Sequence, residues 1–345
     1  MLAELPADSG LALQRLSPSA WVAAGAPQRT PLGELGYGVS MPGVAAAPSR
    51  VAARLLSPAG PMVDAWISGA GPQQSGTCGS VRWRHDGRWL YGTLELDEAV
   101  ERCGLGALTE RAYRDVFATL AHSGYPHLLR VWNYLPHINA DDRGMERYRQ
   151  FNAGRQQAFL HAGHAAFEGA PAACAIGTSD GPFCVHFLAG RSAAVALENP
   201  RQVPAYRYPS DYGPRSPSFS RAALVDAGAG RVALLISGTS SIVGHHSVHV
   251  GDVAAQTRET LANLRAVLQA AHTRSSARFD LAALHLTVYL RRARQLPLIR
   301  AELEAAVGAE SFAAQTAVYL EADICRSDLW VEIEAHAFAP GVVTA

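Results

Sequence analysis

Residues 251–272 read GDVAAQTRETLANLRAVLQAAH, and this stretch decides the fold because it predicts one long amphipathic helix. Asp252 is a residue type that caps helix N-termini, and apolar or small side chains recur every three or four positions after it. The side chains on the expected inner face are Val253, Thr257, Leu261, Leu264 and Leu268. A helix with such a face has to pack against a sheet or against another helix.

The residues that follow predict the partner of this helix. We expect a strand over 281–291, a helix over 296–308, and two strands over 316–322 and 329–338. The C-terminal part of the chain is therefore expected to pack helices on one sheet.

The same order of elements occurs earlier in the chain. The expected elements are a hairpin over 82–96 that turns at Asp86-Gly87, a helix capped by Thr109 over 110–124, a strand over 127–135, a helix over 144–163, and strands over 172–178 and 183–190. FCVHFLA (183–189) aligns with LWVEIEA (329–335), and this alignment puts His186 at the position of Glu332. The chain therefore looks duplicated.

This pattern predicts an α+β protein in two halves, each with a mixed sheet and packed helices. We expect an N-terminal domain over 1–190, a connecting segment over 191–230 that is rich in Pro, Ser and Tyr, and a C-terminal domain over 231–345.

Composition excludes several classes of function. The 345 residues are 48% hydrophobic, and 30 basic residues balance 30 acidic ones, so neither a nucleic acid nor a membrane surface is an expected partner. The chain has no lysine, which excludes a lysine Schiff base, a pyridoxal-phosphate linkage and a GxxxxGK[ST] phosphate loop. The start of the chain lacks a signal-peptide pattern, and five widely spaced cysteines favour reduced thiols, so we expect a cytoplasmic protein.

Glu332 and Glu334 alternate with apolar residues in VEIEA, so both carboxylates should lie on one face of a strand. Such a pair is often a solvated face. The alternative is a carboxyl group among apolar neighbours, which stays protonated near neutral pH and serves as a general acid.

Two other groups of residues could bind ligands. The histidines of GHHSVH (244–249) resemble metal-ligand spacing, but no HExxH glutamate accompanies them, and hydrogen-bonded histidines at a turn are the preferred interpretation; we expect no metal. RYRQFNAGR (147–155) places Tyr148, Asn152 and Arg155 on one helix face, which is either solvent-facing or ligand-facing.

Four long motifs occur in an order that resembles the chorismatases, from about residue 80 to the C-terminus. They are RVWNYLPHIN (130–139), GMERYRQFNAGRQQAF (144–159), SGTSSIVGHHSVHVGD (237–252) and YLEADICRSDLWVEIEA (319–335). Chorismatases cleave chorismate into pyruvate and a C7 cyclic acid. The C-terminal third also resembles the YjgF-type deaminase fold, so the resemblance implies two YjgF-like, chorismate-mutase-like halves. The arginine with which YjgF-type deaminases hold an imino acid is replaced here by Gln-Thr-Ala (315–317), so imine deamination is not expected.

The resemblance implies roles for individual residues. Glu332 would be the acid that protonates the enolpyruvyl methylene, and no cofactor would be needed. Arg155 and Tyr148 would bind one substrate carboxylate, with Tyr208, Tyr212 and Arg215 as further candidates from the 206–215 loop.

The resemblance also bears on the product. Gly238 in the SGT motif together with Cys325 is similar to the branch that forms 3-hydroxybenzoate through an epoxide; Cys325 would then help to steer the collapse of the intermediate, although a small packing residue is the alternative. The other functions left open are a chorismatase that gives both 3- and 4-hydroxybenzoate and a non-catalytic small-molecule sensor. Chorismate is the only expected partner, and a monomer is favoured.

Overall fold

The computed structural model describes residues 10–23, 31–38, 49–69 and 74–344. The first nine residues, which contribute to the expected absence of a signal peptide, lie outside these ranges. None of the helices in the described part of the chain is long and apolar enough to cross a bilayer.

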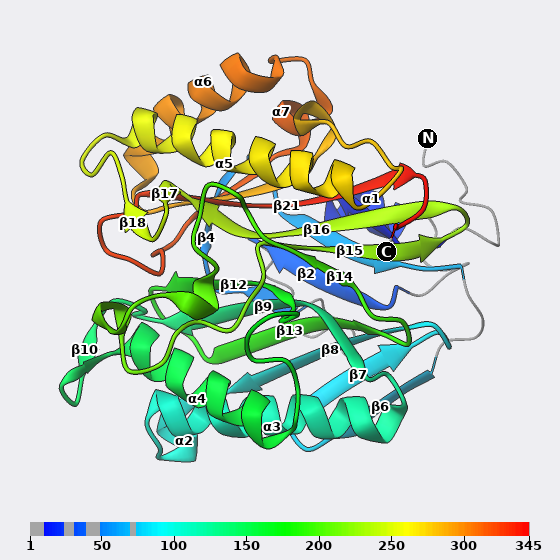
Figure 1. Cartoon of the computed structure of the whole chain (residues 1–345), viewed down its shortest axis with the longest axis vertical. Helices are drawn as coiled ribbons and strands as arrows, with labels where there is room; N and C mark the ends of the chain where they lie inside the picture. The colour runs from blue at the N-terminus through cyan, green and yellow to red at the C-terminus, as the bar shows by residue number, and fades with distance from the viewer. Residues whose placement is uncertain (1–9, 24–30, 39–48, 70–73, 345) are drawn as a thin grey trace.

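Two large sheets lie face to face, and each carries helices on its outer side (Figure 1). The N-terminal elements are β1 (Ala12–Leu16), α1 (Pro18–Ala23), β2 (Gly33–Tyr37), β3 (Ser49–Val51), β4 (Arg54–Ser57) and β5 (Met62–Ile67). The first half continues with β6 (Gln74–Cys78), β7 (Val81–His85), β8 (Trp89–Leu96), α2 (Glu98–Glu101), α3 (Leu105–Ser123), β9 (His127–Pro136), β10 (Asp141–Asp142), β11 (Met145–Glu146), α4 (Arg147–His161), β12 (Ala172–Thr178) and β13 (Phe183–Gly190).

The second half begins with two strands and two short 3-10 helices. These are β14 (Val195–Leu197), η1 (Ala205–Arg207), η2 (Ser210–Tyr212) and β15 (Ala222–Gly228). The remaining elements are β16 (Arg231–Ser240), β17 (Ile242–Val243), β18 (His246–Ser247), α5 (Val253–Thr273), η3 (Leu281–Ala283), β19 (His285–Leu290), η4 (Ala293–Gln295), α6 (Leu296–Val307), α7 (Phe312–Thr316), β20 (Val318–Glu321) and β21 (Val331–Pro340).

The strand orders confirm the duplication. The first large sheet has the order β12-β9-β13-β8-β7-β6, and the second has the order β14-β15-β16-β21-β19-β20-β4. In the reverse direction, the second sheet runs β20-β19-β21-β16-β15-β14, and these strands correspond one by one to those of the first sheet. Strand β4 is an additional strand at the edge of the second sheet, next to β20. The pairs β12–β9 and β20–β19 are both parallel.

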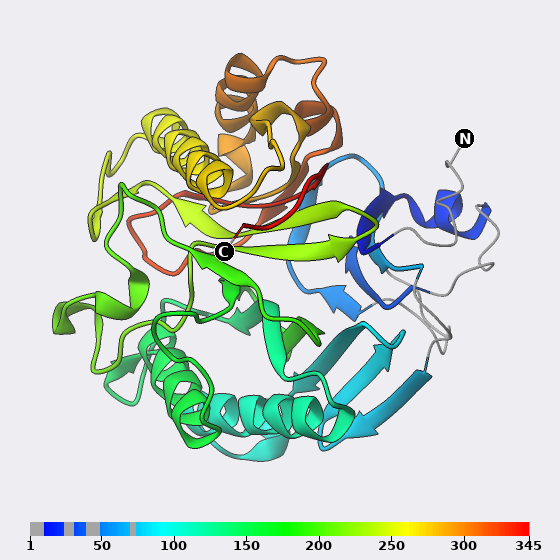
Figure 2. The same ribbon diagram turned by 45° about the vertical axis from the view of Figure 1, so that its right-hand side comes forward.

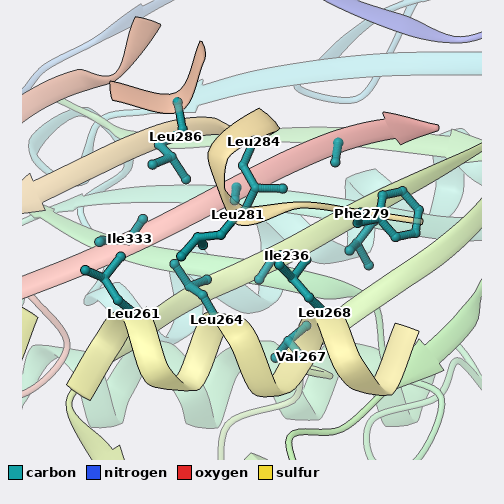
Figure 3. Packing of buried hydrophobic residues seen from close by; sticks show 14 of the residues in the cluster. Ile236, Leu261, Leu264, Val267, Leu268, Phe279, Leu281, Leu284, Leu286 and Ile333 are labelled. Carbon is teal, nitrogen blue, oxygen red and sulfur yellow. The ribbon is translucent and has the colours of Figure 1, made fainter. Parts of the chain in front are cut away.

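Helix α5 covers the outer face of the second sheet, as its pattern predicts (Figure 3). Leu261, Leu264 and Leu268 are buried against the sheet with Ile236 and Ile333. The Asp252 side chain accepts a hydrogen bond from the Ala255 backbone N–H at 2.9 Å, so the predicted cap is confirmed. The odd-numbered residues at the start of β21 face this helix, and the even-numbered ones therefore face the first sheet.

Helices α3 and α4 cover the outer face of the first sheet (Figures 1 and 2). The prediction that Thr109 caps the first of them was wrong. Helix α3 begins one turn earlier, after Gly104, because Leu105 and Leu108 are buried in the core beneath it.

Three further sequence expectations need correction. Cys184, rather than His186, takes the position of Glu332: Cys184 lies opposite Tyr134 on β9, and Glu332 lies opposite Tyr289 on β19. The Tyr134 and Tyr289 hydroxyls are 3.0 Å apart, where the two halves meet.

The other two corrections concern the ends of the halves. Strands β14 and β15 fall inside the expected connecting segment 191–230 but belong to the second sheet, so the long irregular part is 198–221, which contains η1 and η2. Strand β4, from the N-terminal part, pairs with β20 of the second half. We therefore propose two halves whose boundary lies near residue 190, with β4 crossing it.

Candidate active site

Two adjoining cavities lie where the halves meet, with volumes of about 270 and 40 Å³. The walls come from α4, from β9 and β12 of the first sheet, from the irregular segment before β15, and from β16, the loop before β21 and β21 itself. The residues that line both cavities are Tyr148, Pro217, Phe219, Gly238, Cys325 and Glu332.

Glu332 and Glu334 do share a face of β21, but that face is buried between the sheets. Their exposed fractions are 4% and 0%. The solvated-face interpretation of the VEIEA pattern is therefore wrong, because the first sheet covers the face of β21 that carries the two glutamates.

The two glutamates differ in their partners. Glu334 is ion-paired with Arg130 of β9, and the Tyr289 hydroxyl donates to its Oε1 at 3.0 Å. Glu332 lines both cavities. Glu334 is thus fixed by partners inside the protein, whereas Glu332 is exposed to the two cavities.

Burial raises the pKa of Glu332 to about 8, and the nearby charge of Glu334 adds to this, while Arg130 and Arg221 act in the opposite direction. The carboxyl group is therefore protonated at neutral pH. A neutral acid that lines a cavity has a proton to give to a substrate.

Gly238 lies directly against the Glu332 carboxyl group. A Cβ atom at position 238 would lie 1.9 Å from Glu332 Oε1 and 2.7 Å from its Cδ, so glycine is needed for this carboxyl position. Gly238 sits where the register of β16 against β21 shifts, between Ile236 and Thr239.

Cys325 precedes β21 and lines both cavities next to Glu332. Burial, followed by the charge of Glu332, raises the pKa of the thiol to about 12. Cys325 is therefore a neutral thiol rather than a thiolate nucleophile. It also packs beside Ile242, Ile324 and Leu329, as the packing interpretation expects.

Arg155 on α4 reaches the smaller cavity and is 2% exposed. Its Nη1 donates to the Ser218 carbonyl, and its guanidinium lies 5.0 Å from the Phe159 ring centroid. Its Nε and Nη2 have no acceptor among the described residues. Arg155 therefore brings a buried cation with unused donors to the wall of the smaller cavity.

The 206–215 loop supplies only part of what the sequence suggested. Tyr208 and Tyr212 line the larger cavity, and the Tyr212 hydroxyl donates to the His245 carbonyl at 2.7 Å. Arg215 is exposed and lines neither cavity, because the chain after Gly213 turns it toward solvent. The structure does not support its role as a ligand-binding residue.

Two other arginines, Arg221 and Arg326, line the larger cavity instead, and sequence reasoning missed both. Arg221 Nη2 donates to the Tyr208 hydroxyl at 2.8 Å, and the Arg326 guanidinium lies 4.1 Å from the Tyr212 ring centroid. Arg221 Nε and Arg326 Nη2 have no acceptor in the described ranges. Arg326 stands next to Cys325 inside a quoted motif, so it could have been found there, whereas no pattern marks Arg221.

The histidines of GHHSVH take part in side-chain packing. His245 lies against Tyr212 and His246, with ring centroids 5.7 and 3.9 Å away. Within the described residues, no group of three His, Cys, Asp or Glu side chains is arranged to hold a metal ion.

Comparison with known proteins identifies the family of this chain. Residues 64–189 match the family model described as chorismatase FkbO/Hyg5-like, N-terminal. A 3-hydroxybenzoate synthase of Streptomyces hygroscopicus is 37% identical over 289 residues, which cover 79% of this chain and 81% of the relative. A chorismatase of Streptomyces rapamycinicus is 38% identical over 280 residues, which cover 79% of this chain and 80% of that protein.

A solved structure supports the same assignment over nearly the full length. A crystal structure of a chorismatase matches with a TM-score of 0.80 and 29% identity, covering 96% of this chain and 99% of that one. The identity and coverage of these relatives, together with the shared fold, show that this chain belongs to the chorismatase family of enzymes.

Proposed function

We propose that this enzyme converts chorismate into 3-hydroxybenzoate and pyruvate. The observation that carries the proposal is the buried, protonated Glu332, which lines both cavities close to three arginines with unused N–H donors. The 37% identical relative named 3-hydroxybenzoate synthase supports the choice of product. A monomer in the cytoplasm that acts on free chorismate is part of the same proposal.

Substrate binding would use the arginines at the two ends of the joined cavities. Chorismate carries two carboxylates, which need charged or hydroxyl donors once they are buried. Arg155 with Tyr148 would hold one of them, and Arg221 with Arg326 the other. Tyr208 and Tyr212 position these last two guanidiniums.

Glu332 would start the reaction by giving its proton to the terminal methylene carbon of the enolpyruvyl ether. The resulting oxocarbenium ion makes the pyruvyl oxygen a good leaving group. The ring 4-hydroxyl then displaces that oxygen at C3, returning its proton to Glu332, and the products are pyruvate and an epoxide. Opening of the epoxide at C4 with loss of the C3 proton restores the aromatic ring, so no water is consumed.

The roles of Gly238 and Cys325 follow from their places beside this carboxyl group. Gly238 would let the Glu332 carboxyl lie close to the strand, and Cys325 would fill the wall with a neutral, weakly polar group. A wall of this kind would favour attack by the ring hydroxyl over attack by water.

The direct test is incubation of the purified protein with chorismate and no added metal, followed by chromatography. We expect pyruvate and 3-hydroxybenzoate in equal amounts. A dihydroxycyclohexadiene carboxylate would reject the epoxide route, and a mixture of 3- and 4-hydroxybenzoate would identify the bifunctional branch. No turnover, combined with tight binding of chorismate, would favour a sensor.

A further inference from the structure

Arg130 and Glu334 form an ion pair between the two halves, and both side chains are fully buried. Arg130 comes from β9 of the first sheet and Glu334 from β21 of the second. Neither residue lines either cavity, so neither would touch the substrate. A buried ion pair gives little net stability compared with apolar residues of similar size, so its position next to Glu332 needs another explanation.

We propose that Glu334 is a positioning residue for the reaction: by holding the Arg130 guanidinium, it prevents that cation from pairing with Glu332 and so keeps the proton on Glu332. This inference rests on the proposed role of Glu332 as the acid.

Either of the two carboxylates on β21 could pair with Arg130. Glu332 and Glu334 are two positions apart on one face of β21, which corresponds to roughly 7 Å along a strand. Arg130 Nε and Nη1 have no acceptor in the described part of the chain, so the guanidinium has donors left for a second carboxylate. The guanidinium also lies 5.0 Å from the Trp132 ring centroid, which holds it in place.

Glu334 is itself fixed by further groups, so it can hold the cation. Arg130 contacts its Oε2, and the Tyr289 hydroxyl donates to its Oε1 at 3.0 Å. The Tyr134 hydroxyl lies 3.0 Å from that of Tyr289. Both carboxylate oxygens of Glu334 therefore have a donor, and Glu332 is left for the substrate.

Few charges act on Glu332 besides this pair. The charges that act on it are those of Glu334, Arg130 and Arg221, and the titratable groups coupled to it are Cys174, Cys325 and Tyr148. Six other charged residues line the cavities with Glu332, but their charges are not among those that act on it: Glu146, Arg149, Arg155, Asp211, Arg326 and Asp328. Burial raises the pKa values of the two thiols and the phenol, so these three are neutral. Without Glu334, the charges left acting on Glu332 would be those of the two cations Arg130 and Arg221, and the pKa of the carboxyl group would fall.

The experiment measures kcat/KM against pH for Glu334→Gln, Arg130→Gln and the double variant. For the unmodified enzyme, activity should fall as pH rises through about 8, where Glu332 loses its proton. In Glu334→Gln the uncompensated Arg130 should move this fall to lower pH by roughly one to three units. In Arg130→Gln it should stay or move to higher pH, and in the double variant it should return close to that of the unmodified enzyme.

Asp64→Asn is the matched control. Asp64 forms another buried ion pair, with Arg15, but its charge is not among those that act on Glu332. Loss of that pair should lower stability without moving the pH profile. If all four variants lose activity equally at every pH, or if Arg130→Gln moves the profile to lower pH, the proposal is wrong.

Infrared difference spectroscopy reads the Glu332 proton without requiring turnover. The protonated-carboxyl band that disappears in Glu332→Gln should persist at pH 7 in the unmodified protein and lose half or more of its intensity in Glu334→Gln. The double variant leaves no unpaired charge and should keep the band. If Glu334→Gln does not fold, the band of the double variant can still be measured. A band that titrates as described in a protein that does not turn over chorismate would refute the proposed function but not this inference.

Discussion

Glu332 is the residue on which the proposed chemistry depends, and one change tests it. Glu332→Gln keeps the size of the side chain but removes the acidic proton. We expect turnover of chorismate to fall roughly 10³-fold, because proton transfer by a positioned acid typically contributes 10²–10⁴-fold. Chorismate affinity, measured by calorimetry, should stay within a few-fold of the unmodified enzyme.

The control for this variant is Glu310→Gln, the same substitution at an exposed glutamate after α6. It should leave turnover and affinity unchanged. Near-normal turnover in Glu332→Gln would remove the acid role, whereas loss of both turnover and affinity would point to a binding role instead.

Gly238 offers a second test at the scale of a single residue. In Gly238→Ala the new methyl group would meet the Glu332 carboxyl at 1.9 Å, so that carboxyl has to move. We expect kcat to drop at least tenfold, about 1.4 kcal/mol in the activation barrier, and the diene to appear among the products when Cys325→Val is added. Product ratios from chromatography give the answer.

Gly60→Ala is the comparison for this variant, because nothing lies within 4 Å of a Cβ there. It should behave like the unmodified enzyme. An unchanged product ratio in the Gly238→Ala, Cys325→Val enzyme would mean that these two positions are packing residues only.

At the scale of elements, the close approach of α3 and α4 fixes the wall that carries Tyr148 and Arg155. A Cβ at Gly154 of α4 would lie 2.0 Å from the Gly106 carbonyl oxygen of α3. Gly154→Ala should therefore push the helices apart, lower the free energy of unfolding by about 1–3 kcal/mol, and raise KM for chorismate. Denaturant unfolding and steady-state kinetics measure the two effects.

Gly106→Ala tests the same contact from the other helix. Its Cβ would lie 3.4 Å from the Gln150 carbonyl oxygen, an ordinary contact distance, and alanine favours a helix over glycine. This variant should be as stable as the unmodified protein or slightly more so. Equal losses in both variants would show that helix packing here is set by something other than the Gly154 approach.

Elements with strong periodicity could be predicted from the sequence, and elements whose ends depend on packing could not. Helix α5 has its cap and its inner face where the pattern put them. Helix α3 starts before Thr109, because Leu105 and Leu108 join the core, and Leu281–Ala283 is the 3-10 helix η3 before β19. Local sequence carries propensity, whereas these ends are decided by tertiary burial.

At the scale of the whole molecule, the duplicated order of elements was visible in the sequence, but the way the halves face each other was not. That arrangement buries Glu332 and Glu334, which pattern alone would leave in solvent, and it brings Arg130 to Glu334 across the boundary. Arg221 and Arg326 reach the cavity for the same reason. Contacts between distant segments leave no periodic trace, so the family motifs located Glu332 whereas its electrostatic surroundings required the structure.

Burial of an acid between two sheets also predicts how the stability of the whole protein depends on pH. The pKa of Glu332 is about 8 in the folded protein against 4.5 for an ordinary glutamate, so the folded state binds its proton more tightly than the unfolded state. The contribution of Glu332 to the free energy of unfolding is therefore fully present below pH 4.5 and is lost as pH rises toward 8. Glu332→Gln removes the titrating group and with it this loss.

The expected result is a difference in unfolding free energy between Glu332→Gln and the unmodified protein that grows in favour of the variant by about 3 kcal/mol from pH 5 to pH 7.5. Denaturant unfolding at several pH values measures it, and Glu310→Gln should show no such trend. A constant difference across this range would mean that Glu332 is already ionised in the folded protein, and the enzyme would then need another source for the proton that starts the reaction. The same folded-state pKa of Glu332 governs both measurements. The pH at which the loss of stability levels off should therefore be the pH at which activity falls.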